Sequence, residues 1–437
     1  MKKTNKFTIL GAGLAGLSTS FHLGHESCII YEAKPYYGGL IYSDFCSGFT
    51  WDMGPHISFT KNEYVRSIFE ESVNQEFEEY EVHVNNFFKG YWIDHPAQCN
   101  LYQLPEPLRT KCLDSFLYSR FQETQLTNPR SYQDWLYQAF GPVFADVFPA
   151  AYTRKYWTTD PVNLGVDWIG PRVYYPDIED VKNGFKGPLG HNTYYVTKVR
   201  YPSQGGFISF ARKLADGAQI ICNKTLQTIN FRTRKLGFSD GTQIGYDILV
   251  SSIPLPTLIM CSVDAPAEIH EAASILRCTN LLLVNIAASH ERKRNNHWIY
   301  VYDEDKLSTR ISFTEGFSPN NAPYETTGIQ VEVYGSAYSP LPKDYKDVIY
   351  KVQLELIEMG LLESREAVIS VHVRYIPWAN VIFDHNRQSA LDKINSFLDS
   401  IGVIRAGRFA EWKYLWTDDS LLSGQRAAEQ CLHHLYT

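Results

Sequence analysis

The fold of this chain is decided near its N-terminus by the stretch Phe7-Thr8-Ile9-Leu10-Gly11-Ala12-Gly13-Leu14-Ala15-Gly16. The apolar run at 7–10 is typical of a buried strand, and the apolar spacing from 14 to 23 is typical of a helix. A second strand-like run at 28–31 follows the helix and ends at Glu32. Together these segments predict a β-α-β unit of about 30 residues.

The glycines of this unit have the spacing Gly11-x-Gly13-x-x-Gly16, and Glu32 follows about 20 positions later. The first glycine permits a tight turn, the second lets the backbone approach a pyrophosphate, and the third lets helix and strand pack closely. The start of the helix offers free N–H groups and a positive dipole end to phosphates. Glu32 can accept hydrogen bonds from ribose hydroxyls. The pattern therefore predicts a dinucleotide site formed by Gly11, Gly13, Ala15, Gly16 and Glu32.

Composition and charge exclude several classes of protein. The chain has 437 residues, of which 44% are hydrophobic, and 41 Lys and Arg against 48 Asp and Glu give a net charge of −7. This length and hydrophobic content favour a folded protein of two or three units, and the charge pattern disfavours nucleic acid as a partner. The scattered cysteines indicate a reduced protein without a zinc ribbon, and no metal is expected. No apolar run of about 18 residues occurs, so we expect a cytoplasmic protein without a transmembrane segment.

The rest of the chain suggests two further regions. The stretch from about 64 to 199 is rich in aromatics and prolines and lacks β-α alternation, which predicts a largely helical insertion that shapes a pocket. Alternating segments at 298–302, 309–313 and 329–334 predict an antiparallel sheet. Segments 345–359 and 389–401 have the spacing of amphipathic helices.

Residues after Glu32 distinguish between FAD and NAD. The Gly38-Gly39 pair resembles the second phosphate-contacting turn of the FAD-dependent superfamily of amine oxidases, phytoene desaturases and protoporphyrinogen oxidases. The stretch 49–56, Phe-Thr-Trp-Asp-Met-Gly-Pro-His, resembles the motif of that superfamily that passes the isoalloxazine. The resemblance implies FAD as the cofactor.

Later motifs extend this resemblance over nearly the whole chain. Residues 201–207 resemble the Pro-x-x-Gly-Gly turn of these flavoproteins, and 224–226 lie where the family places a strand that contacts the adenine. Residues 407–414, followed by Asp419-Ser420, resemble the closing FAD segment. The implied additional cofactor-binding residues are Gly38, Gly39, Gly54, Leu226, Gly407, Arg408, Tyr414 and Ser420.

The resemblance implies an α/β fold with a Rossmann-like FAD-binding domain of the GR2 type. We expect this domain to be assembled from 1–70, 200–275 and 370–437. A largely helical substrate or cap region is expected at 71–199, and an antiparallel-sheet substrate region at 276–369.

Within the superfamily, further motifs resemble those of the UDP-galactopyranose mutases, both the eukaryotic-type group and related bacterial surface-polysaccharide proteins. Residues 54–59 resemble their Gly-Gly-His loop, and 168–173 (Trp-Ile-Gly-Pro-Arg-Val) resemble their Trp-x-Gly-x-Arg-Val segment. The segments 298–300, 309–310 and 412–414 resemble their other diphosphate-contacting segments. The implied substrate-binding residues are Arg172, Tyr300, Arg310 and Tyr414, and the implied catalytic residues are His56, Arg172 and Arg310.

This resemblance implies interconversion of the pyranose and furanose rings of a nucleotide sugar, with a UDP-sugar favoured, through N5 of reduced flavin in surface glycan biosynthesis. It also implies an electron donor such as NAD(P)H or a reductase, and an oligomer is possible. His56 is expected either to orient N5 or its proton, or to be a core histidine bonded to a carbonyl.

Two departures from the mutase pattern keep other functions open. Pro55 replaces the second glycine of the loop, as in desaturase-type members, and 378–381 (Trp-Ala-Asn-Val) lack a tyrosine that mutases carry there. An FAD-dependent oxidoreductase of the amine oxidase, protoporphyrinogen oxidase or desaturase type is therefore an alternative. A non-catalytic flavin-bound partner in a glycan pathway is a third hypothesis.

Overall fold

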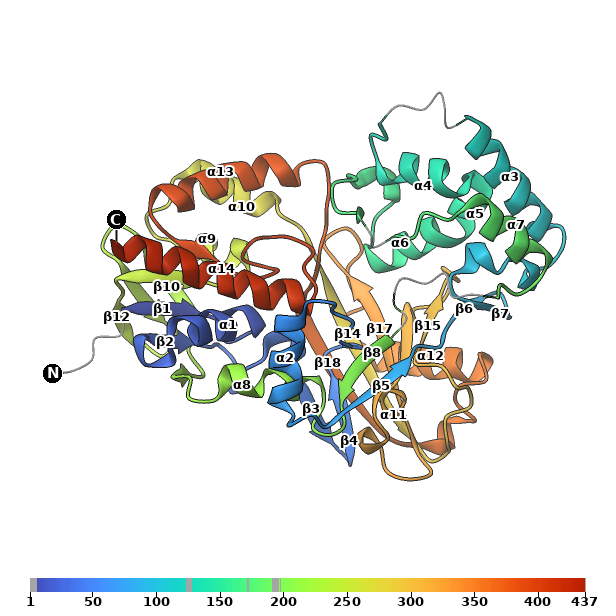
Figure 1. The fold of residues 1–437 in the computed structure, drawn as a ribbon, viewed down its shortest axis with the longest axis horizontal. Helices are drawn as coiled ribbons and strands as arrows, with labels where there is room; N and C mark the ends of the chain where they lie inside the picture. The colour runs from blue at the N-terminus through green and yellow to red at the C-terminus, as the bar shows by residue number, and fades with distance from the viewer. Residues whose placement is uncertain (1–5, 123–127, 171–172, 191–195, 197, 437) are drawn as a thin grey trace.

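The computed structural model describes residues 6–122, 128–170, 173–190, 196 and 198–436. Figure 1 shows three parts: a parallel-sheet unit that carries both ends of the chain, a large antiparallel sheet below it, and a group of helices to one side. None of the helices formed by the described residues combines the length and apolar character that crossing a bilayer requires.

The predicted β-α-β unit is confirmed and forms the centre of a five-stranded parallel sheet. Its strand order is β19-β13-β1-β2-β9. All four residues of β1 and the whole first half of α1 are buried, which explains the continuous apolar character of this stretch. The bounds are β1 Phe7–Leu10, α1 Leu14–Leu23, β2 Cys28–Tyr31, β9 Ile220–Ile221, β13 Ile248–Ser251 and β19 Ile404–Arg405.

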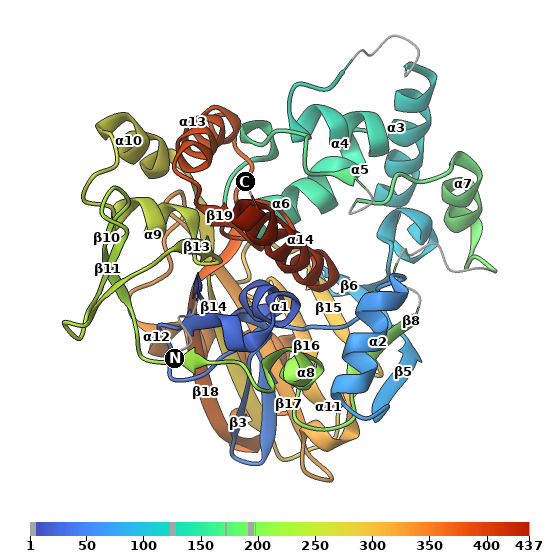
Figure 2. The same ribbon diagram turned by 60° about the vertical axis from the view of Figure 1, so that its left-hand side comes forward.

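The last helix, α14 (Thr417–Tyr436), lies along α1 in both views (Figures 1 and 2). The hydroxyl of Ser18 donates to the main-chain oxygen of Leu421 at 2.6 Å. A Cβ at Gly424 would lie 2.4 Å from the oxygen of Ala15, so only glycine permits this close approach. The end of the chain is thereby fixed against the glycine turn at its beginning.

The second sheet has seven strands in the order β18-β14-β17-β16-β15-β6-β7, all antiparallel neighbours except β15 and β6. Helix α12 (Tyr345–Glu358) packs on it through a core that includes Val284, Val331 and Val352. The bounds are β6 Val84–Phe88, β7 Tyr91–Asp94, β14 Cys278–Ala288, β15 Trp298–Val301, β16 Arg310–Phe313, β17 Thr327–Gly335 and β18 Val368–Val381.

The predicted strands and helices of this part are confirmed, but the sheet takes strands from outside the expected range 276–369. Strand β18 pairs with β14 along most of its length, so the sheet continues to Val381. Strands β6 and β7 come from the region expected to be helical. Their pattern is obscured because Asn86 is buried and its amide bonds within the hairpin, to the main-chain oxygens of Ile93 and Asp94.

Five helices formed by the described residues between 108 and 186 lie together (Figure 1, upper right). Their shared core contains Leu136, Phe140, Phe144 and Phe148. Helix α4 begins with a capping box in which Ser131 and Asp134 satisfy each other's backbone N–H groups. The bounds are α3 Leu108–Gln122, α4 Tyr132–Phe140, α5 Pro142–Ala145, α6 Ala151–Tyr156 and α7 Ile178–Lys186.

A buried lysine joins the helical region to the antiparallel sheet. The Nζ of Lys155, on α6, donates to the main-chain oxygens of Val301, Asp303 and Ser308 at 2.7–2.9 Å. From the other side, the carboxylate of Glu355 accepts from the N–H groups of residues 307 and 308 and from the Ser308 hydroxyl. The loop between β15 and β16 is therefore held between α6 and α12.

Replacing Lys155 with methionine should lower the free energy of unfolding by about 2–4 kcal/mol, because three carbonyl groups lose their shared donor. The exposed Lys182, paired with Glu179 on the surface of α7, provides the control. Lys182→Met should change the free energy of unfolding by no more than about 0.5 kcal/mol. Urea denaturation of both variants measures the difference, and equal small effects would show that Lys155 does not anchor the loop.

Candidate active site

A continuous cavity of about 850 Å³ lies where the three parts meet. One end is formed by the glycine turns of the parallel-sheet unit, and the other by a tyrosine-rich region that we call the tyrosine chamber, lined by Tyr152, Tyr156, Tyr300, Tyr302, Tyr334 and Tyr414. The sequence-predicted residues that line the cavity are Gly11, Gly13, Ala15, Glu32, Gly38, Gly39, Gly54, His56, Leu226, Tyr300, Arg310, Gly407, Arg408, Tyr414 and Ser420. Arg172 lies outside the described residues.

The first glycine turn combines close packing with an open surface. Gly11 has φ +94°, and a Cβ on Gly16 would lie 2.0 Å from the Gly11 oxygen, so Gly16 serves protein packing. Gly13 is different, because a Cβ there would meet nothing within 4 Å. Gly13 is also the N-cap residue of α1, and no side chain caps this helix. The helix start thus keeps N–H donors for an anionic group in the cavity.

The second glycine turn packs directly on the first. The N–H of Gly38 donates to the Ala12 oxygen at 2.8 Å, and a Cβ on Gly39 would lie 3.2 Å from the Cα of Gly13. Glu32 is 9% exposed and accepts hydrogen bonds from the N–H groups of Ala12 and Lys34. Each carboxylate oxygen keeps a further lone pair for a hydroxyl group. This open, glycine-lined cradle with an acid at its side fits a dinucleotide.

The C-terminal segment completes the cradle. Gly407 has φ +88°, its N–H donates to the Ser423 hydroxyl, and a Cβ there would lie 2.6 Å from the Cβ of Ala15. Ser420, in the first turn of α14, faces the same cavity. Segments from both ends of the chain therefore share one surface of the site.

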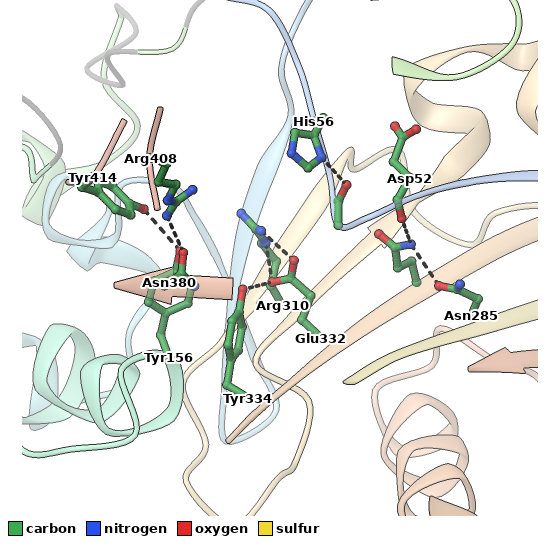
Figure 3. A network of polar contacts seen from close by, with 12 residues as sticks. Asp52, His56, Tyr156, Asn285, Arg310, Glu332, Tyr334, Asn380, Arg408 and Tyr414 are labelled. Atoms are coloured by element: carbon green, nitrogen blue, oxygen red, sulfur yellow. Dashed lines mark hydrogen bonds and ion pairs between the residues drawn. The ribbon is translucent and has the colours of Figure 1, made fainter. Parts of the chain in front are cut away.

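An ion pair crosses the floor of the tyrosine chamber. Arg310 on β16 is the register partner of Glu332 on β17, and its Nε and Nη2 contact the two carboxylate oxygens at 2.8 and 2.7 Å (Figure 3). The Tyr334 hydroxyl donates to the same carboxylate at 3.0 Å. Burial is the largest single influence on Arg310 and lowers its pKa, but Glu332, Tyr334 and Tyr152 together raise the pKa of that guanidinium well above its ordinary value.

The second guanidinium of the chamber, that of Arg408, is held by an amide and an aromatic ring. Arg408 donates from Nη2 to the amide oxygen of Asn380 at 2.7 Å and lies over the ring of Tyr414 (Figure 3). Among the described residues no carboxylate pairs with Arg408, and its buried Nε lacks an acceptor. The Tyr156 hydroxyl donates to the same Asn380 oxygen at 3.1 Å. This arrangement leaves an uncompensated positive charge facing the cavity.

His56 lies on the loop between the cradle and the chamber. Its Nδ1 is 2.9 Å from the Gly54 oxygen, so Nδ1 carries the proton and Nε2 can accept one hydrogen bond. Burial lowers the pKa of His56 to about 4, and the positive charges of Arg310 and Arg408 act in the same direction. His56 is therefore bonded to a carbonyl, as one of the two hypotheses expects, and it also lines the cavity; that it orients flavin N5 or its proton stays a prediction.

The buried carboxyl group of Asp52 fixes the N-terminal end of this loop. Asp52 accepts from the hydroxyls of Ser43 and Tyr201 at 2.5 and 2.8 Å, and from the N–H of Phe207 at 3.1 Å. Burial raises the pKa of Asp52 to about 6, and these hydrogen bonds oppose the rise. Asp52, in the stretch 49–56, therefore connects this loop to the Pro-x-x-Gly-Gly turn at 201–207.

Sequence reasoning missed several chamber residues. Glu332 and Tyr334 share one face of β17, which the alternation Ile329, Val331, Val333 on the other face indicates. Tyr152 and Tyr156 are four residues apart on α6, a spacing that core packing produces equally well. The sequence marks the segment 378–381 only as lacking the tyrosine that mutases carry there, and it does not indicate a role for Asn380 itself.

The family model described as "Flavin containing amine oxidoreductase" matches residues 14–432. The chain belongs to this family.

Three solved structures show the same fold. A reduced UDP-galactopyranose mutase has a TM-score of 0.90 at 24% identity, covering 99% of this chain and 96% of that one. A putative protoporphyrinogen oxidase from Exiguobacterium sp. 255-15 has a TM-score of 0.76 at 13% identity, covering 100% of both chains. A putrescine oxidase double mutant has a TM-score of 0.64 at 12% identity, covering 98% of this chain and 99% of that one.

Family membership confirms that the chain is a flavoenzyme with FAD as its cofactor. The cradle fits this assignment, since the uncapped start of α1 and the open side of Gly13 face the cavity. When bound, FAD supplies the redox-active flavin ring, and the roles of individual cavity residues stay predictions.

A matched pair of glycine variants separates cofactor contact from protein packing. Gly13→Val should fold normally but bind no FAD, because the new side chain enters only the cavity. Gly16→Val should destabilise even the flavin-free protein by at least about 2 kcal/mol, because its Cβ meets the Gly11 oxygen. Flavin absorbance per protein and urea denaturation of the apoproteins measure both effects. A yellow Gly13→Val protein would contradict the placement of the cofactor.

The lowered pKa of His56 predicts a pH dependence of stability. An unfolded histidine takes up a proton near its ordinary pKa of 6.5, whereas folded His56 resists protonation until about pH 4. Its contribution is therefore fully present above pH 6.5 and is lost as the pH falls toward 4. Between pH 7 and pH 5 the wild type should lose about 1–2 kcal/mol more unfolding free energy than His56→Gln, which cannot titrate. Parallel losses would indicate a histidine with an ordinary pKa.

Proposed function

We propose that this flavoenzyme interconverts the pyranose and furanose forms of a nucleotide-activated sugar, with a UDP-sugar favoured. The observation that carries the proposal is the guanidinium of Arg408, which no carboxylate of the described residues balances, beside the ion pair of Arg310 and Glu332, in a chamber continuous with the FAD cradle. Surface glycan biosynthesis, a cytoplasmic location and an electron donor such as NAD(P)H or a reductase belong to the same proposal.

The chamber has the chemistry that a diphosphate needs. A guanidinium offers a planar set of N–H donors that match phosphate oxygens, and it remains charged when buried. Tyrosine hydroxyls add donors without adding charge. Tyr300 and Tyr414 face the cavity beside the two arginines. In this proposal the sequence-predicted ligands Arg172, Tyr300, Arg310 and Tyr414 hold the diphosphate. Arg408, which the sequence resemblance assigns to FAD, joins them.

Neutral His56 serves a different purpose in this proposal. Because its Nδ1–H is held by the Gly54 oxygen, only Nε2 is available, and only as an acceptor. It can orient a donor at the flavin without adding a third positive charge to the site. Bound FAD, in its reduced form, supplies the nucleophilic N5 for ring interconversion.

The same charges disfavour the commonest alternative substrates. An ammonium substrate of an amine oxidase would meet the uncompensated charge of Arg408, and an apolar polyene would leave that charge buried without a partner. Pro55 favours the second candidate, an FAD-dependent oxidoreductase. Proline lacks an N–H and fixes φ, so it restricts the redox-linked peptide movement that a mutase loop would make at this position.

Anaerobic reduction of the purified protein with dithionite, followed by titration with UDP-, TDP- and GDP-sugars, tests the proposal. Flavin absorbance reports binding, and product analysis reports ring size. Saturable binding and a change of ring size without net flavin oxidation are expected. Absence of binding, together with stoichiometric O₂ consumption on another substrate, would establish the oxidoreductase instead.

Removing both charges of the buried pair tests its role in anion binding. Arg310 cannot be removed alone, because Glu332 would remain as a buried unpaired charge. The double variant Arg310→Gln/Glu332→Gln should raise the dissociation constant for UDP at least about tenfold while retaining FAD, since a bidentate phosphate donor is lost. The exposed pair of Arg154 and Glu304 offers the matched control, and its double glutamine variant should bind UDP normally. Equal effects of the two double variants would contradict direct binding by Arg310.

A further inference from the structure

Asn380 occupies a rigid and unusual position in the antiparallel sheet. It lies near the end of β18, where the register with β14 shifts between Thr279 and Leu281. Such a bulge turns side chains away from the regular alternation of the strand. Asn380 is 4% exposed, and its N–H donates to the Thr279 hydroxyl at 3.1 Å. The backbone therefore fixes where this side chain lies.

The orientation of the Asn380 amide follows from its neighbours. A guanidinium can only donate hydrogen bonds, so the atom 2.7 Å from Nη2 of Arg408 must be the amide oxygen. The same oxygen accepts from the Tyr156 hydroxyl at 3.1 Å. Both donors use one neutral acceptor, and Figure 3 shows the contact from Arg408.

Neutrality at this position decides the charge of the chamber. Among the described residues of the chamber, Glu332 balances the charge of Arg310, and the charge of Arg408 is left without a balancing carboxylate. An aspartate of the same shape would accept the same two hydrogen bonds but would cancel that charge. The amide thus orients Arg408 without neutralising it.

We infer that Asn380 is a specificity-determining residue that keeps the charge of Arg408 available to an anionic group of the substrate. It stands in the segment that lacks the phosphate-contacting tyrosine expected from mutases, and it acts through Arg408 and Tyr156 rather than by its own contact. The inference rests on the proposed function, because it assigns the charge to the substrate and not to FAD.

The test compares Asn380→Asp with Asn380→Ala in the FAD-loaded, reduced protein. Asn380→Asp should raise the dissociation constant for UDP at least about tenfold, through loss of the net charge. Asn380→Ala, which leaves Arg408 charged but unoriented, should raise it only about twofold to threefold. Asn163→Asp, at an exposed site, controls for the added negative charge and should have no effect. Flavin content should be unchanged in all three variants.

Each other outcome has a definite meaning. Equal losses in Asn380→Asp and Asn380→Ala would overturn the role of charge, and loss of FAD from Asn380→Asp would assign Arg408 to the cofactor and overturn the inference. If the wild type binds no UDP, the proposed function fails. Inorganic pyrophosphate is then the probe: weaker binding to Asn380→Asp than to wild type would still support an anion site set by Asn380, and equal or absent binding would overturn it.

Discussion

The close approach of several distant segments to the turn at Gly11 is the constraint on which the rest of this structure depends. The hydroxyl of Ser252, just after β13, donates to the oxygens of Leu10 and Gly11. Gly407 and Gly424 bring the C-terminal segment within contact of Ala15. A side chain at any of these glycines would push apart elements that lie hundreds of residues apart in sequence. One turn therefore organises both the parallel sheet and the cofactor cradle.

Charge is distributed along the cavity in a way that packing alone does not require. At the floor of the chamber, Arg310 is balanced by a glutamate on the neighbouring strand. At the wall, Arg408 is held by an amide and an aromatic ring, neither of which carries charge. Burying a guanidinium without a counterion is unfavourable unless a ligand supplies the negative charge. The difference between the two arginines is therefore explained better by a ligand that binds at Arg408 than by the packing of the fold.

The β-α-β unit could be predicted from sequence because all of its determinants are local: an apolar run, three spaced glycines and an acid after the second strand. The strands β15, β16 and β17 were predicted for the same reason. Strands β6 and β7 were not, because the buried amide of Asn86 interrupts their apolar alternation. Glu332 shows a second reason why sequence prediction fails. The alternation of β17 predicts which face of the strand carries Glu332, but it does not predict which side chain of the neighbouring strand contacts it. Only the order of strands in the sheet places it opposite Arg310.

The loop from Gly54 to His56 couples the two ends of the cavity. Its lower end is tied by Asp52, whose carboxyl accepts three hydrogen bonds and whose main-chain oxygen accepts a fourth, from Gln330. A Cβ at Gly54 would lie 2.9 Å from a carboxylate oxygen of Glu332.

Proline at position 55 has a fixed φ and no N–H, and His56 bonds back to the Gly54 oxygen, so the loop has little freedom of its own. The carboxylate that it touches is the one that binds Arg310. A displacement of this loop toward β17 would therefore act directly on the ion pair of the chamber, so the loop couples the cradle end of the cavity to the chamber end.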